Sequence, residues 1–338
     1  MLELLLISTI KIVVMLIILL TTAAYMVLAE RRISAAVQDR IGPNRVGWQG
    51  FLQPLADLVK LVTKEDIVPK ASNRFIHDLA PIISVFVALS TFAVVPFGNT
   101  IELFGRTIKL QIADVNIGIL YILALASVGV YGITLSGWSS NNKYSLLGGM
   151  RSSAQMISYE LSMGLSIIGV VMIAGSLQLD KIVEAQSGLR WNIFLQPIGF
   201  ITFLVSSFAE TNRTPFDLPE AEPELVGGYH TEYSGLKFGL FFLAEYCNMV
   251  VSSAVITTLY LGGWQFPYVE TFGFSPFTVS LLQVGAFAVK VAALLFFFIL
   301  VRWTVPRFRY DQLMNIGWKV MLPLALANIV VTGMVLLM

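Results

Sequence analysis

The sequence contains very little cysteine and histidine. Cys247 is the single cysteine among 338 residues, and His77 and His230 are the two histidines. One cysteine allows no disulfide within the chain and cannot hold a four-cysteine iron–sulfur cluster. The histidines fall in different expected loops, so they provide no helical pair for a haem. We therefore expect any redox cofactor to be held by a partner chain.

Charged residues are also scarce. They make up 13% of the chain, whereas a soluble domain carries about a quarter, and 56% of the residues are apolar. The mean hydropathy is +0.77. The formal net charge of +1 gives no reason to expect a nucleic-acid partner. These values predict an integral membrane protein, in contact with the lipid bilayer.

Long apolar segments account for most of the sequence. A bilayer core takes about 20 apolar residues per helix, and the segments of that kind are 4–28, 79–97, 115–135, 157–179, 191–209, 238–262, 277–301 and 316–337. The predicted fold is an all-α integral membrane protein with eight transmembrane helices, an amphipathic interfacial helix and ordered cytoplasmic loops. Because no long Gly/Ser linker divides the chain, residues 1–338 are expected to form a single polytopic membrane domain.

Lysine and arginine are distributed unevenly between the two sets of loops. With eight spans, the loops at about 29–78, 136–156, 210–237 and 302–315 share one face and, together with Lys319, hold 16 of these residues, against 4 on the opposite face. The positive-inside rule makes the first face cytoplasmic. The predicted location is a bacterial plasma (inner) membrane, crossed several times, with both termini periplasmic. Glu3 and the length of the first span argue against a cleavable signal peptide.

The connection at residues 209–235 is unusually acidic. It holds six carboxylates, three prolines and a single basic residue, Arg213. The prolines at 215, 219 and 223 cannot all lie in one regular helix, so we expect an ordered, irregular loop. Its carboxylates are Glu210, Asp217, Glu220, Glu222, Glu224 and Glu232.

Three of these acids, Glu220, Glu222 and Glu224, alternate along the loop, so in an extended chain their side chains point the same way. Crowded carboxylates in a low-dielectric pocket cannot all ionise, and some of their pKa values rise. This pattern favours a proton path or a charge sensor. A solvated acidic loop is the alternative, and the apolar and aromatic residues between the acids argue against it.

The first expected cytoplasmic loop contains a short amphipathic stretch. From residue 51 to 62 the apolar residues fall at 51, 52, 55, 58, 59 and 62, which is a helical spacing. We expect a helix lying in the membrane interface. It is either a surface anchor or a lip over a hydrophobic cavity, and the turn at residues 42–44 favours the lip because it folds the loop back.

Four ionisable residues fall in or beside the apolar segments. Glu245 and Lys290 lie inside theirs, where ionisable groups cost at least ~2.5–3.5 kcal/mol and usually have a function. The alternative is a Glu245–Lys290 ion pair that only fixes helix packing. Lys11 lies nearer an outer end and can extend its ammonium to water. Glu160 opens the fourth segment, where simple capping of a helix N-terminus is the alternative.

Four long motifs appear in a fixed order: AERRISAAVQDRIGPNRVG, LQPLADLVKLVTKE, AETNRTPFDLPEAEPELVGGYHTEYSG and RWTVPRFRYDQLMNIGWK. In this order they resemble the quinone-site membrane subunit of respiratory complex I, the bacterial H-type subunit of proton-translocating NADH:quinone oxidoreductase. The resemblance covers nearly the whole chain. It implies an eight-helix subunit that forms most of the quinone tunnel, with quinone as substrate and with no flavin, haem or iron–sulfur cluster held by this chain.

The resemblance also implies roles for particular residues and partners. The tunnel and its entrance map onto Glu30, Arg31, Arg40, Asp57 and Glu65. The acidic chain that couples quinone reduction to proton pumping maps onto Glu160, Glu210, Glu220, Glu222, Glu224 and Glu245, with Arg213 and Asp217 in the same loop. The implied partners are peripheral-arm subunits that hold iron–sulfur clusters and the quinone head, and neighbouring membrane subunits of the pumping arm.

Two other functions remain open at this point. Related membrane subunits serve membrane-bound hydrogenases and ferredoxin-driven complexes, and the electron donor is decided by other subunits. A freestanding ion transporter is the second alternative, which the intramembrane Glu245 and Lys290 permit. The sequence shows no inverted repeat of the kind common in transporters, which argues against it. A passive scaffold does not explain the acidic loop.

Overall fold

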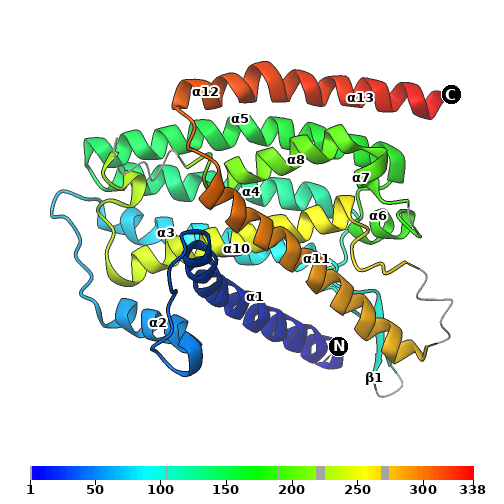
Figure 1. Ribbon diagram of the computed structural model, residues 1–338, viewed down its shortest axis with the longest axis horizontal. Helices are drawn as coiled ribbons and strands as arrows, with labels where there is room; N and C mark the ends of the chain where they lie inside the picture. The colour runs from blue at the N-terminus through cyan, green and yellow to red at the C-terminus, as the bar shows by residue number, and fades with distance from the viewer. Residues whose placement is uncertain (1, 104–105, 189, 218–224, 268–273) are drawn as a thin grey trace.

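The computed structural model describes residues 2–103, 106–188, 190–217, 225–267 and 274–338 of the chain. Most of this part is helical, and the long helices lie side by side in one bundle (Figure 1). One small hairpin is the exception to the all-α prediction. The alternating acids Glu220, Glu222 and Glu224 lie outside the described residues.

Seven helices in the described part of the chain are long and apolar enough to cross a membrane. They account for seven of the eight predicted spans, the last of them in three consecutive pieces. Their bounds are α1 (Leu2–Val37), α3 (Arg74–Thr91), α4 (Gly118–Ser139), α5 (Lys143–Ala174), α10 (Gly235–Tyr260), α11 (Pro276–Thr304) and α12–η5–α13 (Tyr310–Asn315, Ile316–Met321, Leu322–Leu337). The middle piece, η5, is a π-helix.

The predicted span at 191–209 forms two shorter helices, α7 (Asn192–Leu195) and α8 (Pro197–Glu210). The break falls at Gln196, the residue before a proline, where the backbone leaves the helical region (φ −132°, ψ 56°). The Gln196 side chain is buried and bonds to α13, donating to Thr332 Oγ1 and accepting from Asn328 Nδ2, both at 2.7 Å. With 14 residues, α8 is shorter than each of the seven long apolar helices.

Two helices continue well past the apolar segments that predicted them. α1 extends through the charged residues 30–32 to Val37, because Ala, Glu and Arg are good helix formers. α5 begins at Lys143, with the Asn142 side chain accepting from the Tyr144 amide at 3.0 Å. The stretch 136–156, expected to be a loop, is therefore mostly helix, and three residues join α4 to α5.

The amphipathic stretch forms α2 (Gln53–Thr63), preceded by the short helix η1 (Trp48–Gly50). This confirms the predicted helix. Its apolar side chains remain outside the chain's own core: Leu55, Leu58, Val59 and Val62 are between 53% and 62% exposed. α2 lies at one end of the molecule, beside the last turns of α1 and the start of α10 (Figure 1).

The opposite end of the molecule carries the hairpin β1 (Thr100–Leu103) and β2 (Arg106–Lys109) and the helix α6 (Leu179–Ala185). The strands pair antiparallel, with Thr100 opposite Lys109. Lys109 connects β2 to α6, since its ammonium lies 2.5 Å from Asp114 and 3.7 Å from Asp180 of α6. The hydrogen bond from Lys109 lowers the pKa of Asp114. The short helix η2 (Phe92–Val94) connects α3 to this region.

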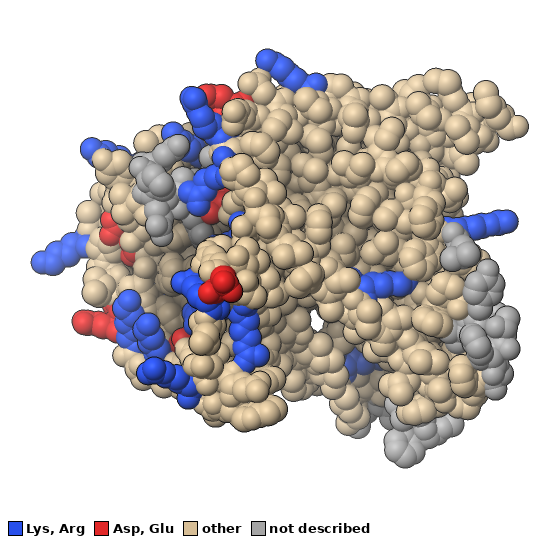
Figure 2. All heavy atoms as spheres, viewed as in Figure 1, with Lys and Arg blue, Asp and Glu red and all other residues tan. Residues whose placement is uncertain are grey.

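α10 is the most enclosed of the long helices, and it packs against α1, α3 and α11. Its side chains at Cys247, Ile256, Leu259 and Tyr260 have no exposed surface. By contrast, α1, α11 and α13 expose many apolar side chains. Charged side chains gather at the end of the molecule where α2 lies (Figure 2), as the loop counts predict.

Candidate functional site

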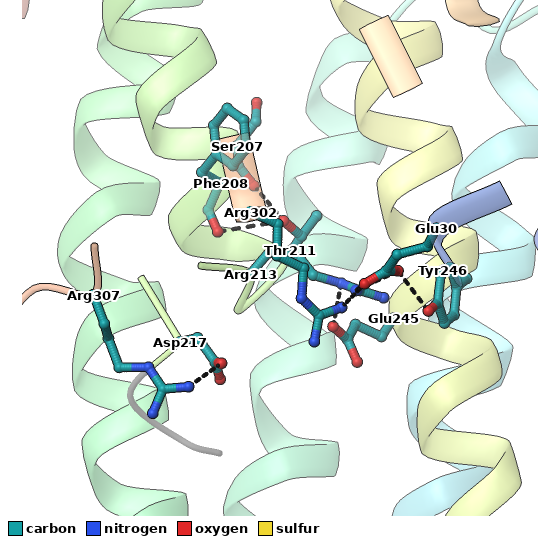
Figure 3. A network of polar contacts seen from close by, with 10 residues as sticks. All are labelled: Glu30, Ser207, Phe208, Thr211, Arg213, Asp217, Glu245, Tyr246, Arg302 and Arg307. Atoms are coloured by element: carbon teal, nitrogen blue, oxygen red, sulfur yellow. Dashed lines mark hydrogen bonds and ion pairs between the residues drawn. The ribbon is translucent and has the colours of Figure 1, made fainter. Parts of the chain in front are cut away.

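A buried carboxylate, Glu30, lies near the end of α1 and has three polar partners (Figure 3). It is 5% exposed. Arg213 Nη1 lies 3.0 Å from its Oε2, Arg302 forms a second ion pair, and the Tyr246 hydroxyl donates to Oε2 at 2.7 Å. Such partners are required because removing an isolated carboxylate from water costs several kcal/mol. One charge thus joins α1, the turn after α8, α10 and α11.

Arg213 lies at the centre of this group. It follows α8 after a tight turn in which Asn212 has a positive φ of 50°, and its side chain is 3% exposed. The guanidinium pairs with Glu30 and with Glu245 of α10 and lies 4.3 Å from the Tyr246 ring centroid. Burial alone would lower the pKa of Arg213, but the two carboxylates raise it well above its usual value.

We call Glu30, Arg213, Glu245, Tyr246 and Arg302 the arginine–glutamate cluster. It holds two carboxylates and two guanidinium groups, so its formal charges cancel. A cluster of this kind is sensitive to an added charge, because its groups lie where the dielectric constant is low and electrostatic forces are strong. It is also sensitive to loss of a partner, which would leave a buried charge uncompensated.

A cavity of about 70 Å³ lies beside the cluster and is lined mainly by residues of α3, α4, α5, α8 and α10. Most of its lining is apolar, but Glu245 and Glu210 contribute carboxylates, and Asn248, Ser252 and Thr211 contribute neutral polar groups. A water molecule needs roughly 10–15 Å³ of such volume and two to four polar partners. The cavity therefore has the size and the chemistry to hold a short water chain between two carboxylates.

Glu160 lies in the middle of the long helix α5. Ser127 of α4 donates a hydrogen bond to its Oε1. The alternative of N-terminal capping is therefore wrong, because α5 begins at Lys143, more than four turns before Glu160. Residues 143–156 carry many polar side chains, which is typical of a loop, but here they continue the helix.

The first part of the acidic loop is anchored to α5. Gln155 Nε2 donates to the carbonyls of Ala209 and Phe216, at 2.8 and 2.7 Å. Asp217, which is 4% exposed, accepts from Arg307 Nη2 at 2.9 Å (Figure 3). Residues 211–217 of this loop are irregular, as predicted, and all of them except the half-buried Thr214 are buried.

The predicted entrance residues lie around the end of α1 and along α2. Arg31 pairs with Asp57 at 2.7 Å, and Gln53 donates to the same carboxylate at 3.0 Å. Arg40 and Glu65 are exposed, beyond the ends of α1 and α2 respectively. The structure thus joins α1 to α2 through Arg31 and Asp57, and it leaves Arg40 and Glu65 exposed.

Comparison with known proteins identifies the protein family of this chain. Residues 10–333 match the NADH dehydrogenase family. The chain is 53% identical to an H-type subunit of NADH-quinone oxidoreductase from Cytophaga hutchinsonii, over 99% of this chain and 98% of the relative. It is 55% identical to the corresponding protein from Geobacter metallireducens, over 94% and 92%. The chain belongs to the NADH dehydrogenase family.

Membership of the NADH dehydrogenase family confirms the resemblance to the H-type subunit. A further relative of that type, from Flavobacterium johnsoniae, is 50% identical over 98% of this chain and 95% of its own length. Together with the seven long apolar helices, the family identifies a multi-pass membrane protein. Within the described residues, no three His, Cys, Asp or Glu side chains come together in a way that could hold a metal ion.

The structure separates two residues that the sequence suggested as partners. Glu245 pairs with Arg213, whereas the Lys290 ammonium donates to backbone carbonyls at the other end of α10. The alternative of a Glu245–Lys290 ion pair is therefore wrong for this family member. Charged residues on adjacent helices can pair only where they lie at the same level and on facing sides of the two helices. Because α11 crosses α10 obliquely (Figure 1), Lys290 and Glu245 lie at different levels.

Sequence reasoning missed Arg302 and Tyr246 as members of the cluster. Arg302 ends an apolar span, which is a common place for an arginine and gave no particular signal. Tyr246 directly follows Glu245 inside a span, and a buried tyrosine hydroxyl needs a partner. The position of Tyr246 next to Glu245 was therefore the sequence feature that could have indicated its membership of the cluster.

Proposed function

We propose that this chain is a membrane subunit of a proton-translocating NADH:quinone oxidoreductase. The names of its relatives support this role, as do the absence of cofactor-binding cysteine motifs in the sequence and the apolar fold. In the proposal the chain is a single membrane domain with eight spans, in which α7 and α8 together form the fifth. It lies in a bacterial inner membrane with the α2 end facing the cytoplasm and both termini in the periplasm.

The first part of the proposed role is to admit quinone from the bilayer. A quinone has an apolar tail and a polar head, so its path needs apolar walls with few polar groups. The exposed apolar face of α2 supports this assignment, and Arg31, Arg40, Asp57 and Glu65 supply the polar groups near it. Electrons would come from iron–sulfur clusters in peripheral subunits, which would also hold the quinone head.

The second part is to pass the effect of quinone reduction toward neighbouring membrane subunits that pump protons. Reduction of a quinone requires protons and changes the local charge. The arginine–glutamate cluster is the main support for this proposal. Glu30 of α1, one of the proposed entrance residues, and Glu245 beside the cavity both pair with the Arg213 guanidinium. A charge arriving near Glu30 would shift the balance on Arg213 and so alter the proton affinity of Glu245.

From Glu245 the proposed path continues through the cavity to Glu210 and, beyond it, to Glu160. Glu245 and Glu210 line the same cavity, and Glu160 lies on α5, which packs against the α8 helix that ends in Glu210. The loop residues Asp217, Glu220, Glu222 and Glu224 would adjust the charge at the membrane edge. Buried carboxylates near one another suit this task because only some of them can ionise at once.

The test is to replace Glu210 with Gln, which keeps the shape and removes the titratable group. We expect NADH:quinone turnover and proton pumping to fall at least tenfold, while NADH oxidation by an artificial hydrophilic acceptor stays unchanged. Glu222→Gln tests the loop in the same way. Glu184→Gln is a matched control, since Glu184 is an exposed acid on α6 at the opposite end. Full quinone activity in both Glu210 and Glu222 variants would rule out the coupling role.

A further inference from the structure

The C-terminal end of α10 lies inside the protein, although a helix end leaves up to four carbonyl oxygens without helical partners. Leu259 and Tyr260 have no exposed surface, and Trp264 is 3% exposed. A buried carbonyl without a hydrogen bond costs about 1–3 kcal/mol. The chain must therefore bring donors to this end, in a part of the molecule far from the arginine–glutamate cluster.

Two side-chain amides supply the first donors. Gln186, just after α6, donates through Nε2 to the Thr258 carbonyl at 2.9 Å. Asn192 of α7 donates through Nδ2 to the Leu259 carbonyl at 2.7 Å. The Gln186 Oε1 atom also accepts from the Gly262 amide at 3.0 Å. These contacts attach the end of α10 to α6 and α7.

Lys290 of α11 supplies donors to the turn that follows α10. Its ammonium donates to the carbonyls of Leu261, Gly263 and Gln265 at 2.7, 3.0 and 2.7 Å. A primary ammonium has three N–H groups, so all of them are used. The same nitrogen lies 4.5 Å from the Trp191 ring centroid, a cation–π distance.

The turn after α10 is shaped to direct these carbonyls toward Lys290. Gly262 and Gly263 both have positive φ, 74° and 53°, a conformation that side chains disfavour. A Cβ atom at Gly263 would also lie 2.6 Å from Val183, so glycine is required there for space as well. This turn begins where α10 ends at Tyr260, and the negative end of the helix dipole also favours a cation at this place.

The position of Lys290 along α11 is otherwise difficult to explain. Fourteen residues, about 21 Å of helix, separate it from the first residue, Pro276. A lysine so far inside an apolar helix is costly unless it is paired. The buried end of α10 supplies the pairing, because it presents three oxygen atoms at that level of α11.

We propose that the carbonyls of Leu261, Gly263 and Gln265, with the Trp191 ring, form a binding site for a primary ammonium group that Lys290 fills. Lys290 thereby fixes the end of α10 to the middle of α11. In this role Lys290 is a positioning residue, because it acts through backbone carbonyls that take up no proton. This inference does not depend on the proposed path through the acidic residues.

Hydrogen exchange of the purified complex carrying Lys290→Met tests the anchor. The amides of Leu261 and Gly263 both donate to the Thr257 carbonyl, at 3.1 and 2.8 Å, so their protection reports on this turn. We expect them to exchange at least tenfold faster in the variant, while amides of α3 are unchanged. Lys11→Met is the matched control, since Lys11 is an α1 lysine that donates to the Gln111 carbonyl at 3.2 Å. It should leave residues 257–265 unaffected.

Added amines then test the chemistry of the site. In a Lys290→Ala complex, millimolar methylammonium should restore much of the lost protection, whereas tetramethylammonium, which has no N–H group, should not. Unchanged protection in Lys290→Met would overturn the proposal. Equal rescue by both amines would also overturn it, as would a Lys290→Met complex that stops pumping protons while residues 257–265 remain fully protected.

Discussion

Buried charge meets α10 near its middle and at its C-terminal end, and the partners differ in kind. Ten residues into the helix, Glu245 and its neighbour Tyr246 meet Arg213, which also pairs with Glu30. At the far end, Lys290 meets backbone carbonyls. Carboxylates can gain or lose a proton, while carbonyls offer a constant dipole. One helix thus meets carboxylates that can exchange protons at one level and backbone acceptors that take up no proton at the other.

The largest effect is expected from Arg213→Leu, which breaks the cluster at its centre. Glu30 and Glu245 would lose their shared partner, and an uncompensated buried charge costs about 3–5 kcal/mol. We expect little assembled complex, as measured by native gel electrophoresis of solubilised membranes, and no quinone activity. Arg309→Leu is the control, because Arg309 and Asp311 form a pair with side chains 78% and 69% exposed. Equal assembly of the two variants would contradict the central role of Arg213.

An intermediate effect is expected from pH at the start of α10. His230 lies in η3 (Gly228–His230), against Phe238 of the first turns of α10, and burial lowers its pKa to about 4. The unfolded state therefore binds more protons than the folded state between about pH 6.5 and 4, and stability falls as the pH decreases through that range. Between pH 8 and pH 5 the loss is about 1–2 kcal/mol.

Hydrogen exchange at pH 8 and pH 5, corrected for the intrinsic rate, would locate this effect along α10. Faster corrected exchange is expected in residues 228–240 at the lower pH and not in residues 257–265. His230→Gln should remove most of the difference. A uniform response along α10 would contradict the contrast between its two ends.

The smallest effect is expected from the neighbour of Glu30. Arg31 and Asp57 form an ion pair with side chains 46% and 28% exposed, and such pairs contribute about 0.2–1 kcal/mol. A double-mutant cycle with Arg31→Gln and Asp57→Asn should measure a coupling energy in that range, and high salt should reduce it. If these residues border the quinone entrance, the KM for quinone rises more than kcat falls. A coupling energy as large as the cost of breaking the buried cluster would show that burial does not determine how much an ion pair contributes to stability.

Much of this fold could be predicted from the sequence, because long apolar runs have few alternatives in a membrane. The amphipathic spacing at residues 51–62 predicted α2 for the same reason: periodicity reports directly on a helix face. Helix ends were less accurate. The polar stretch before Glu160 continued a helix, since polarity alone does not distinguish an exposed helix from a loop.

The candidate site was harder to predict than the fold. Glu30 and Arg213 were each singled out, but a distance of 183 residues along the chain hides their contact. The partner of Lys290 could not be found by looking for an acid, because its acceptors are main-chain atoms that every residue has. The way two helices cross decides which backbone carbonyls lie beside a given side chain. That geometry cannot be read from a single sequence.

The break before α8 has a consequence for the surrounding lipid. Fourteen residues extend about 21 Å, whereas the hydrocarbon layer is about 30 Å thick, so α8 alone is too short to span that layer. A lone helix of that length would force the bilayer to thin around it. Here the polar residues at its two ends, Gln196 and Thr211, are 3% and 2% exposed. Protein covers both ends, so the polar groups at the ends of this short helix face the interior of the subunit and not lipid.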